Sequence, residues 1–194
     1  MDAMPALNMT EFEKALTTQR IRAFQIISLA LLMGCTLFLG IILFLYATEE
    51  PAETASNNSI LPILSIVHGG MALTMYIPAF LVGRYFAGPR GLMTRMKNAV
   101  PTVAGEDLTV EVLCIGAMFM GFIFRAAILE GMALFGLIVC LMGVLEGQIQ
   151  SEPVYWGNLF SYIVFAVVTL WTFPTKDRLE NLFRERFLQN DFRV

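Results

Sequence analysis

A long stretch without any charged residue runs from Ile26 to Tyr46, and nearly all of its side chains are apolar. A helix needs about 20 consecutive apolar residues to cross the hydrocarbon core of a bilayer, and this stretch is long enough. The chain as a whole has the same character, because 57% of its 194 residues are hydrophobic and only 15% are charged. Its mean hydropathy of +0.67 is too high for a soluble domain of this size. The sequence therefore predicts a membrane protein, and the lipid bilayer is an expected partner.

Three more apolar stretches predict three more spanning helices. They run from about Ile60 to Gly83, from Val112 to Leu145 and from Val154 to Phe173. The first span extends from Ala23 to Tyr46, and the four stretches are called spans one to four in chain order. The fold class expected from them is an all-α, polytopic membrane protein with four transmembrane helices.

Span one is expected to belong to a longer helix that begins before the membrane. Thr10 and Glu13 have the spacing of a capping box, in which the two side chains satisfy free backbone amides at a helix start. The sequence thus predicts one continuous helix from about Glu11 to Tyr46. Residues 1–22 form the amphipathic, cytoplasmic start of that helix.

Span three is too long for a bilayer. From Val112 to Leu145 a helix would measure about 50 Å, whereas the hydrocarbon core is about 30 Å thick. The helix is therefore strongly tilted or broken, or its first half, Val110–Phe124, stands outside the hydrocarbon core against another protein surface. Asp107 is the expected N-cap of this helix.

The distribution of basic residues predicts the orientation. Of the 13 Lys and Arg residues, three precede span one, four lie between spans two and three, five follow span four, and the last is Arg125. Because Lys and Arg concentrate in cytoplasmic connections, both termini and the middle connection are predicted to be cytoplasmic. The expected location is the bacterial cytoplasmic (inner) membrane. The expected parts are residues 1–22, a first transmembrane hairpin 23–83, a basic cytoplasmic loop 84–107, a second hairpin 108–173 and a cytoplasmic tail 174–194.

The tail is expected to form an amphipathic helix. Its charged residues alternate in sign, and its apolar residues recur at helical spacing. Such a helix lies near the membrane or on the other cytoplasmic segments. The apolar positions are Leu179, Leu182, Phe183 and Phe187.

The two hairpins show signs of an internal repeat. The segment Ala30–Phe38 matches Ala127–Phe135, 97 residues later, in its Ala, Leu, Gly and Phe positions. Duplication of a hairpin explains the match, and chance similarity between two apolar helices is the alternative. In each copy two small residues four positions apart let helix backbones approach closely, so spans one and three are expected to meet there. The pairs are Ala30 with Gly34 and Ala127 with Gly131.

Glu130 is the acidic residue most deeply surrounded by apolar sequence. Ionisable groups inside membrane segments cost roughly 2.5–3.5 kcal/mol on insertion scales, which makes Glu130 a candidate functional residue. Arg125 lies five positions earlier, so the two do not face each other as an i,i+4 pair would. Arg125 is expected near the cytoplasmic interface. Glu130 either binds a proton or cation, or it is a hydrogen-bonded carboxyl that holds two helices together.

A family resemblance involves the same segment. Residues 127–138, Ala-Ile-Leu-Glu-Gly-Met-Ala-Leu-Phe-Gly-Leu-Ile, resemble the carboxylate-bearing helix of the proteolipid (c-type) subunits of rotary ATPases. In that family the membrane carboxylate is the ion-binding group, and duplicated members can lack it in one hairpin. The resemblance implies that Glu130 is that carboxylate and Met33 its lost copy. The segment also resembles small uncharacterised bacterial inner-membrane proteins.

His68 is the only histidine in the chain. A haem site usually needs a second axial ligand at matching depth, and the sequence offers no such pattern. We therefore interpret His68 as a hydrogen-bonded core residue and expect no metal and no cofactor.

Sequence motifs of catalysis are also missing. The chain has no zinc spacing, phosphate loop, nucleophile elbow or dinucleotide fingerprint. The middle loop is too sparsely basic to recognise nucleic acid and suits anionic lipid headgroups. The function expected is a non-enzymatic integral membrane subunit that assembles through its helices into a homo-oligomer or a larger membrane complex. The alternative is a proton- or cation-handling protein that uses Glu130, with Arg125 and His68 in support.

Overall fold

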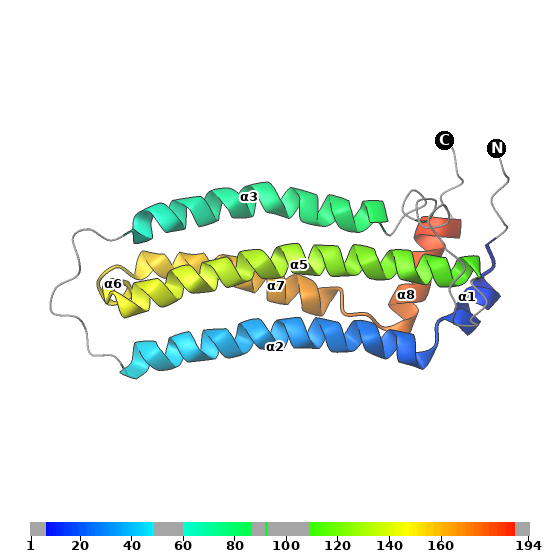
Figure 1. Cartoon of the computed structure of the whole chain (residues 1–194), viewed down its shortest axis with the longest axis horizontal. Coiled ribbons are helices and arrows are strands. Elements are labelled where there is room, and N and C mark those ends of the chain that lie inside the picture. Colours follow the sequence, from blue (N-terminus) through cyan, green and yellow to red (C-terminus); the bar gives the residue numbers. More distant parts are fainter. Residues whose placement is uncertain (1–6, 49–59, 87–91, 93–108, 189–194) are drawn as a thin grey trace, which may run out of the picture. The chain divides into compact units, whose positions relative to one another are not determined.

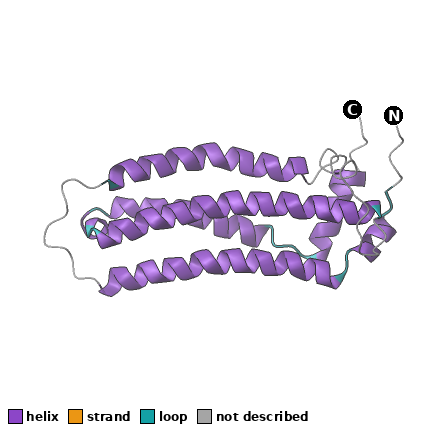
Figure 2. Ribbon diagram, in the orientation of Figure 1, coloured by secondary structure: helices purple, strands orange, loops and turns teal. Residues whose placement is uncertain are grey.

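A computed structural model of the chain describes residues 7–48, 60–86, 92 and 109–188. Within these residues it contains helices and short loops and no strand (Figure 1, Figure 2). The connection 49–59 and nearly all of the basic loop lie outside the described residues, as does Asp107, the predicted N-cap of span three.

The described elements are helical from the first to the last. Four segments are long and apolar enough to cross a membrane, which confirms the predicted all-α class with four membrane-length helices. The fourth consists of a 3₁₀ helix followed by an α-helix. The elements are α1 (Met9–Ala15), α2 (Thr18–Thr48), α3 (Leu61–Phe86), α5 (Val110–Leu145), α6 (Gln148–Ser151), η1 (Pro153–Leu159), α7 (Phe160–Trp171), α8 (Lys176–Phe183) and η2 (Arg184–Leu188).

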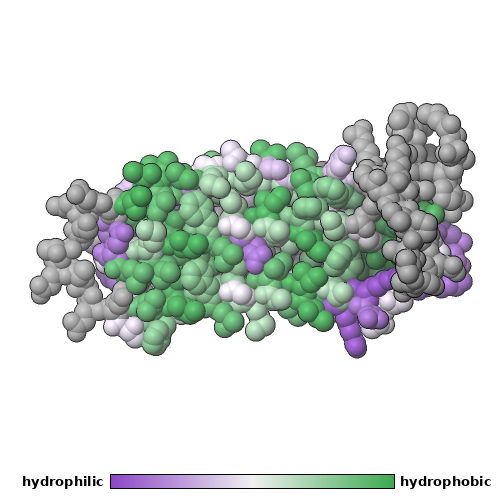
Figure 3. Space-filling view, in the orientation of Figure 1, coloured by the Kyte–Doolittle hydropathy of each residue, from purple (hydrophilic) through white to green (hydrophobic). Residues whose placement is uncertain are grey.

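The chain divides into two compact units. Unit 1 comprises residues 1–27, 80–125 and 173–194, and unit 2 comprises residues 28–79 and 126–172. Several of the long helices contribute one part to each unit. Large apolar side chains are exposed along α2 and α3, as suits lipid-facing helices, and Figure 3 shows much of the visible surface of the long helices as apolar.

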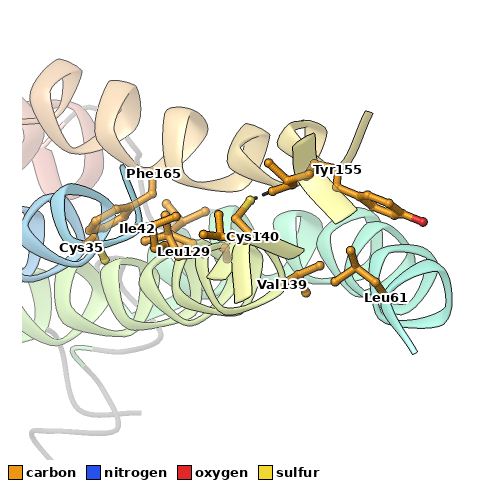
Figure 4. Close-up of a cluster of buried hydrophobic side chains, with 13 residues drawn as sticks. Cys35, Ile42, Leu61, Leu129, Val139, Cys140, Tyr155 and Phe165 are labelled. Atoms are coloured by element: carbon orange, nitrogen blue, oxygen red, sulfur yellow. Dashed lines mark hydrogen bonds between the residues drawn. The ribbon is translucent and has the colours of Figure 1, made fainter. Parts of the chain in front are cut away.

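Unit 2 has a core built around α5. Leu129, Ala133, Leu137, Cys140 and Val144 recur every three or four residues, so they share one face of this helix, and all are buried. Side chains from α2, α3, η1 and α7 pack against that face (Figure 4). The core also contains a bond between elements, because the Cys140 thiol donates to the Tyr155 carbonyl at 3.6 Å.

Unit 1 has a separate core made by amphipathic segments. Phe12 of α1 stacks on Phe183 of α8 with ring centroids 3.9 Å apart. Both rings are buried together with Cys114 and Ile115 of α5 and Phe187 of η2. The tail is therefore amphipathic as predicted as far as Leu188, and it packs on the other segments of its own unit.

The start of α5 corrects an expectation from the sequence. This helix is continuous over 36 residues, so no break shortens it. The stretch Val110–Phe124, expected to need another protein surface, is largely covered by segments of unit 1. The apolar length of this stretch therefore gives no support to a contact with another protein.

The predicted start of the first helix is wrong in two respects. The N-cap is Asn8, whose Oδ1 accepts the Thr10 amide at 2.9 Å, and the expected capping box of Thr10 and Glu13 is not formed. The helix also does not run unbroken from Glu11 to Tyr46, since α1 ends at Ala15 and α2 begins at Thr18.

The break between α1 and α2 has a physical cause. It allows Phe12 and Leu16 to be buried in the core of unit 1. The turn is stabilised at both ends, because the Arg20 guanidinium donates to the Ala15 carbonyl at 2.6 Å and Thr17 Oγ1 accepts the Arg20 amide at 3.4 Å. Tertiary burial thus overrides the helical continuity that the local pattern favours.

The stacking of Phe12 on Phe183 gives a first test. Phe12→Ala should destabilise unit 1 by about 3–5 kcal/mol, because it leaves a cavity where a fully buried ring was. We expect faster tryptic cleavage after Lys176, Arg178 and Arg184 in isolated membranes. Phe44→Ala removes an exposed ring and serves as the control. Equal cleavage rates in the two variants would contradict the packing of α8 on α1.

Candidate functional site

Three of the buried polar side chains of unit 2 form one hydrogen-bonded cluster. His68 of α3 is 4% exposed, Asn158 of η1 is 6% exposed and Ser161 of α7 is 0% exposed. His68 lies seven residues after the start of α3, about 10 Å along the helix. Buried polar groups in a membrane helix bundle are costly unless they are paired, so their hydrogen bonds decide what the cluster can do.

The hydrogen bonds fix the orientation of the Asn158 amide. Its Nδ2 lies 2.9 Å from the Tyr155 carbonyl and 3.0 Å from Ser65 Oγ. A carbonyl oxygen only accepts, so the NH₂ group must point towards Tyr155 and Oδ1 must point towards His68. The distance from Oδ1 to His68 Nδ1 is 2.9 Å.

The same logic fixes the tautomer of His68. Because Asn158 Oδ1 can only accept, Nδ1 of the ring carries the proton and donates it. In the neutral ring Nε2 is then an acceptor, and it receives the Ser161 hydroxyl at 2.8 Å. The Tyr76 hydroxyl donates to Ser161 Oγ at 3.0 Å. The result is a hydrogen-bonded relay that runs from Tyr76 through Ser161 and His68 to Asn158.

The order Ser161, His68, Asn158 is that of a nucleophile, a base and an orienting amide. Two features favour a structural role for it. Ser161 Oγ already accepts from Tyr76, and its side chain is fully buried. We therefore treat the relay as a buried hydrogen-bond network that positions α3 against η1 and α7.

A glycine on α5 makes room for this network. A Cβ at Gly136 would lie 2.9 Å from Cε1 and 3.0 Å from Nε2 of His68, and it would collide with the Asn158 backbone oxygen. The adjacent Phe135 ring meets the imidazole edge to face, with centroids 5.5 Å apart. Only glycine allows the imidazole and η1 to approach α5 this closely.

His68 is therefore the hydrogen-bonded core histidine that the sequence predicted. Both ring nitrogens are occupied, so it is not available to a metal, and no cluster of metal-ligating residues occurs in the described ranges. Its partners were not predicted. The sequence does contain a signal for these partners. Ser65, His68 and Tyr76 have the spacing of one helix face, and Asn158 and Ser161 are three residues apart.

Glu130 has a different environment. It lies half-buried on α5 in unit 2, close enough to the Cys35 thiol for electrostatic interaction. It makes no hydrogen bond or ion pair with any other residue of the described chain. Arg125 belongs to unit 1, where its guanidinium lies over the Phe122 ring at 5.9 Å and near Arg186. The structure therefore pairs Glu130 with neither Arg125 nor His68.

The four small residues of the proposed repeat are all exposed. No atom lies within 4 Å of a Cβ built at Gly34 or Gly131. Spans one and three do pack in unit 2, but they do so through Cys35 and Ile42. The close backbone approach expected within the chain at Ala30, Gly34, Ala127 and Gly131 is thus not found there.

Comparison with protein-family models, with curated proteins and with solved structures finds no match. The class of protein is therefore defined by the fold alone. Four helices of membrane-spanning length and composition make this a multi-pass membrane protein.

The glycine beside His68 gives the second test. Gly136→Ala should destabilise the protein by about 1–3 kcal/mol through overpacking, or roughly 2–4 °C in Tm for each kcal/mol. Gly40→Ala is the control in the same unit, because a Cβ at that position meets no atom. Thermal unfolding of the purified protein in mild detergent measures both. An unchanged Tm for Gly136→Ala would contradict the close contact.

Proposed function

We propose that this chain is a non-enzymatic membrane subunit that assembles through its helices into a homo-oligomer or a larger membrane complex. The observation that supports this is Glu130, a half-buried carboxyl inside a membrane-length helix without a hydrogen-bonding partner in the described chain. A carboxyl left facing lipid is costly, so cover from another protein helix is favourable.

The residues around Glu130 suit such a contact. Ala127 and Gly131, on the same side of α5, are exposed, and α2 presents Ala30 and Gly34 in the same way. Small residues let helix backbones approach closely in lipid, where apolar contact alone gives no net drive. The exposed residues Ala30 and Gly34 of α2 and Ala127 and Gly131 of α5 are together called the small-residue surface below.

The proposed orientation puts both termini and the basic loop in the cytoplasm. All 13 Lys and Arg residues belong to the segments of unit 1, and none belongs to those of unit 2. An asymmetry of this kind supports unit 1 as the cytoplasmic end by the positive-inside rule. The proposed location is the bacterial inner membrane.

The proposed repeat also has support. Helices α2 and α5 end at Thr48 and Leu145, which are 97 residues apart, the same offset as the matched segments. Gly34 and Gly131, equivalent by that offset, are both exposed. Duplication of a hairpin followed by divergence of the second helices accounts for these similarities.

Assembly predicts the effect of a bulky residue on the small-residue surface. Gly131→Leu should reduce a homo-oligomer to monomers, since the added side chain prevents backbone approach. Gly40→Leu is the control, because its Cβ likewise meets no atom and it lies outside that surface. Native mass measurement in mild detergent reports the copy number.

The contribution of the carboxyl is tested with Glu130→Leu. We expect about 1 kcal/mol of lost association, the size of one hydrogen bond between membrane helices, or roughly fivefold in the dissociation constant. A wild-type particle that is monomeric in the same measurement would exclude the homo-oligomer.

A second candidate function is proton or cation handling by Glu130. The same lack of a hydrogen-bond partner favours it, because a carboxyl that binds and releases a proton or cation must be accessible. The two functions differ in the accessibility of the carboxyl. A carboxyl sealed between helices does not react with reagents from the lipid phase, whereas an ion-handling carboxyl does.

Carboxyl reactivity separates the two functions. If Glu130 handles ions, we expect dicyclohexylcarbodiimide to modify it in intact membranes, and cations that compete for the site to slow the reaction. Mass spectrometry of the peptide that contains Glu130 measures the modification, and Glu130→Gln is the control. An unmodified Glu130 would contradict the ion-handling function, and assembly would remain as the proposed function.

A further inference from the structure

A groove of about 430 Å³ opens beside the buried relay. One side is a face of α3 from Ser65 to Tyr76, and the other side is formed by η1 and the start of α7. All of these residues belong to unit 2. Its volume lies within the range of sites that bind small molecules.

The rim of the groove is apolar and exposed. Leu73 and Val154 are each 75% exposed, and Phe160 is 60% exposed. All three belong to segments of membrane-spanning character, so the groove opens sideways towards lipid tails. A ligand would therefore enter from the bilayer.

The inner wall has unused hydrogen-bonding capacity. Ser65 Oγ accepts from Asn158, while its own O–H has no acceptor among the described residues. Tyr76 donates to Ser161, which leaves the lone pairs of its oxygen free to accept. Ser65 is half-buried, and an unused donor in a partly desolvated site is unfavourable, so a polar group that accepts from Ser65 stabilises the site.

Glycines keep the groove empty of side chains. Gly69 and Gly157 both line it, and a Cβ at either position would meet no atom within 4 Å. The space beside these glycines is therefore open to a ligand group.

The lining also determines the charge of the ligand. No Asp, Glu, Lys or Arg side chain lines the groove. An anionic or cationic headgroup would lack compensation there. An uncharged hydroxyl or carbonyl, in contrast, can accept from Ser65, and a hydroxyl can also donate to Tyr76.

We propose that this groove binds an uncharged, membrane-soluble amphiphile with a hydroxyl or carbonyl head and an apolar body. The head lies against Ser65 and Tyr76, and the body leaves past Leu73 and Phe160 into the lipid. The His68 relay joins the α3 wall to the wall formed by η1 and α7. The proposal is independent of Glu130 and of the oligomeric state.

The experiment uses a long-chain alcohol that carries a photoreactive diazirine and an alkyne, added to membranes that contain the full chain. We expect cross-links in the peptides that contain residues 65–76 and 154–161. The matching hydrocarbon probe without the hydroxyl should label them about fivefold less, the effect expected from one net hydrogen bond. Equal labelling by the two probes would overturn the proposed polar head.

Two glycine variants provide a matched pair. Gly69→Leu fills the groove and should abolish labelling by the alcohol probe. Gly70→Leu adds the same side chain one position away, outside the groove and also with no atom in its way, and should leave labelling unchanged. Wild-type labelling in Gly69→Leu, or loss in both variants alike, would overturn the site.

Ser65→Ala tests the recognition of the head. It removes the hydroxyl that we assign to the ligand without enlarging any side chain. Labelling by the alcohol should fall about fivefold, whereas labelling by the hydrocarbon should not change. Unchanged labelling by the alcohol would overturn the role of Ser65.

Discussion

The arrangement of unit 2 depends on the need to satisfy polar groups where no water is available. In that unit the buried residues of α3 are Leu61, His68, Ala72 and Ala79, and only His68 is both large and polar. Apolar contact contributes little free energy to helix association in lipid. The hydrogen bonds from His68 to Asn158 and Ser161 therefore determine the position of α3 relative to η1 and α7. Gly136 of α5 makes this arrangement possible, because the lack of a side chain lets the His68 imidazole and η1 lie close to α5.

Unit 1 is organised by a different requirement, the burial of an apolar helix surface. The first half of α5 is too long and too apolar to be left in water, and the chain covers it with its own amphipathic segments. The break after Ala15 and the tail that begins at Thr175 both serve this cover, since each brings phenylalanine side chains onto the same surface. A feature that looks like an interface in the sequence is thus buried within the chain.

On the long helices α3 and α5, two features are not explained by internal packing, and each carries a proposal. Glu130 is a carboxyl without a hydrogen bond beside the small-residue surface. The groove along α3 contains a hydroxyl donor without an acceptor among the described residues. Each would be stabilised by something from outside the chain, a helix in the first case and an uncharged amphiphile in the second.

The sequence by itself determined the number and approximate limits of the membrane helices, because apolar length is a local property. It also determined the amphipathic tail and the hydrogen-bonded state of His68, which follow from spacing and from the cost of a polar group in lipid. The choice of Asn8 over Thr10 as the cap was not decided there, since both residues are good caps two positions apart. Only the tertiary structure decided the break after Ala15, the partners of His68 and the need for glycine at position 136. These depend on contacts between segments up to about 170 residues apart, such as Phe12 with Phe183, and local pattern carries no information about which distant side chains meet.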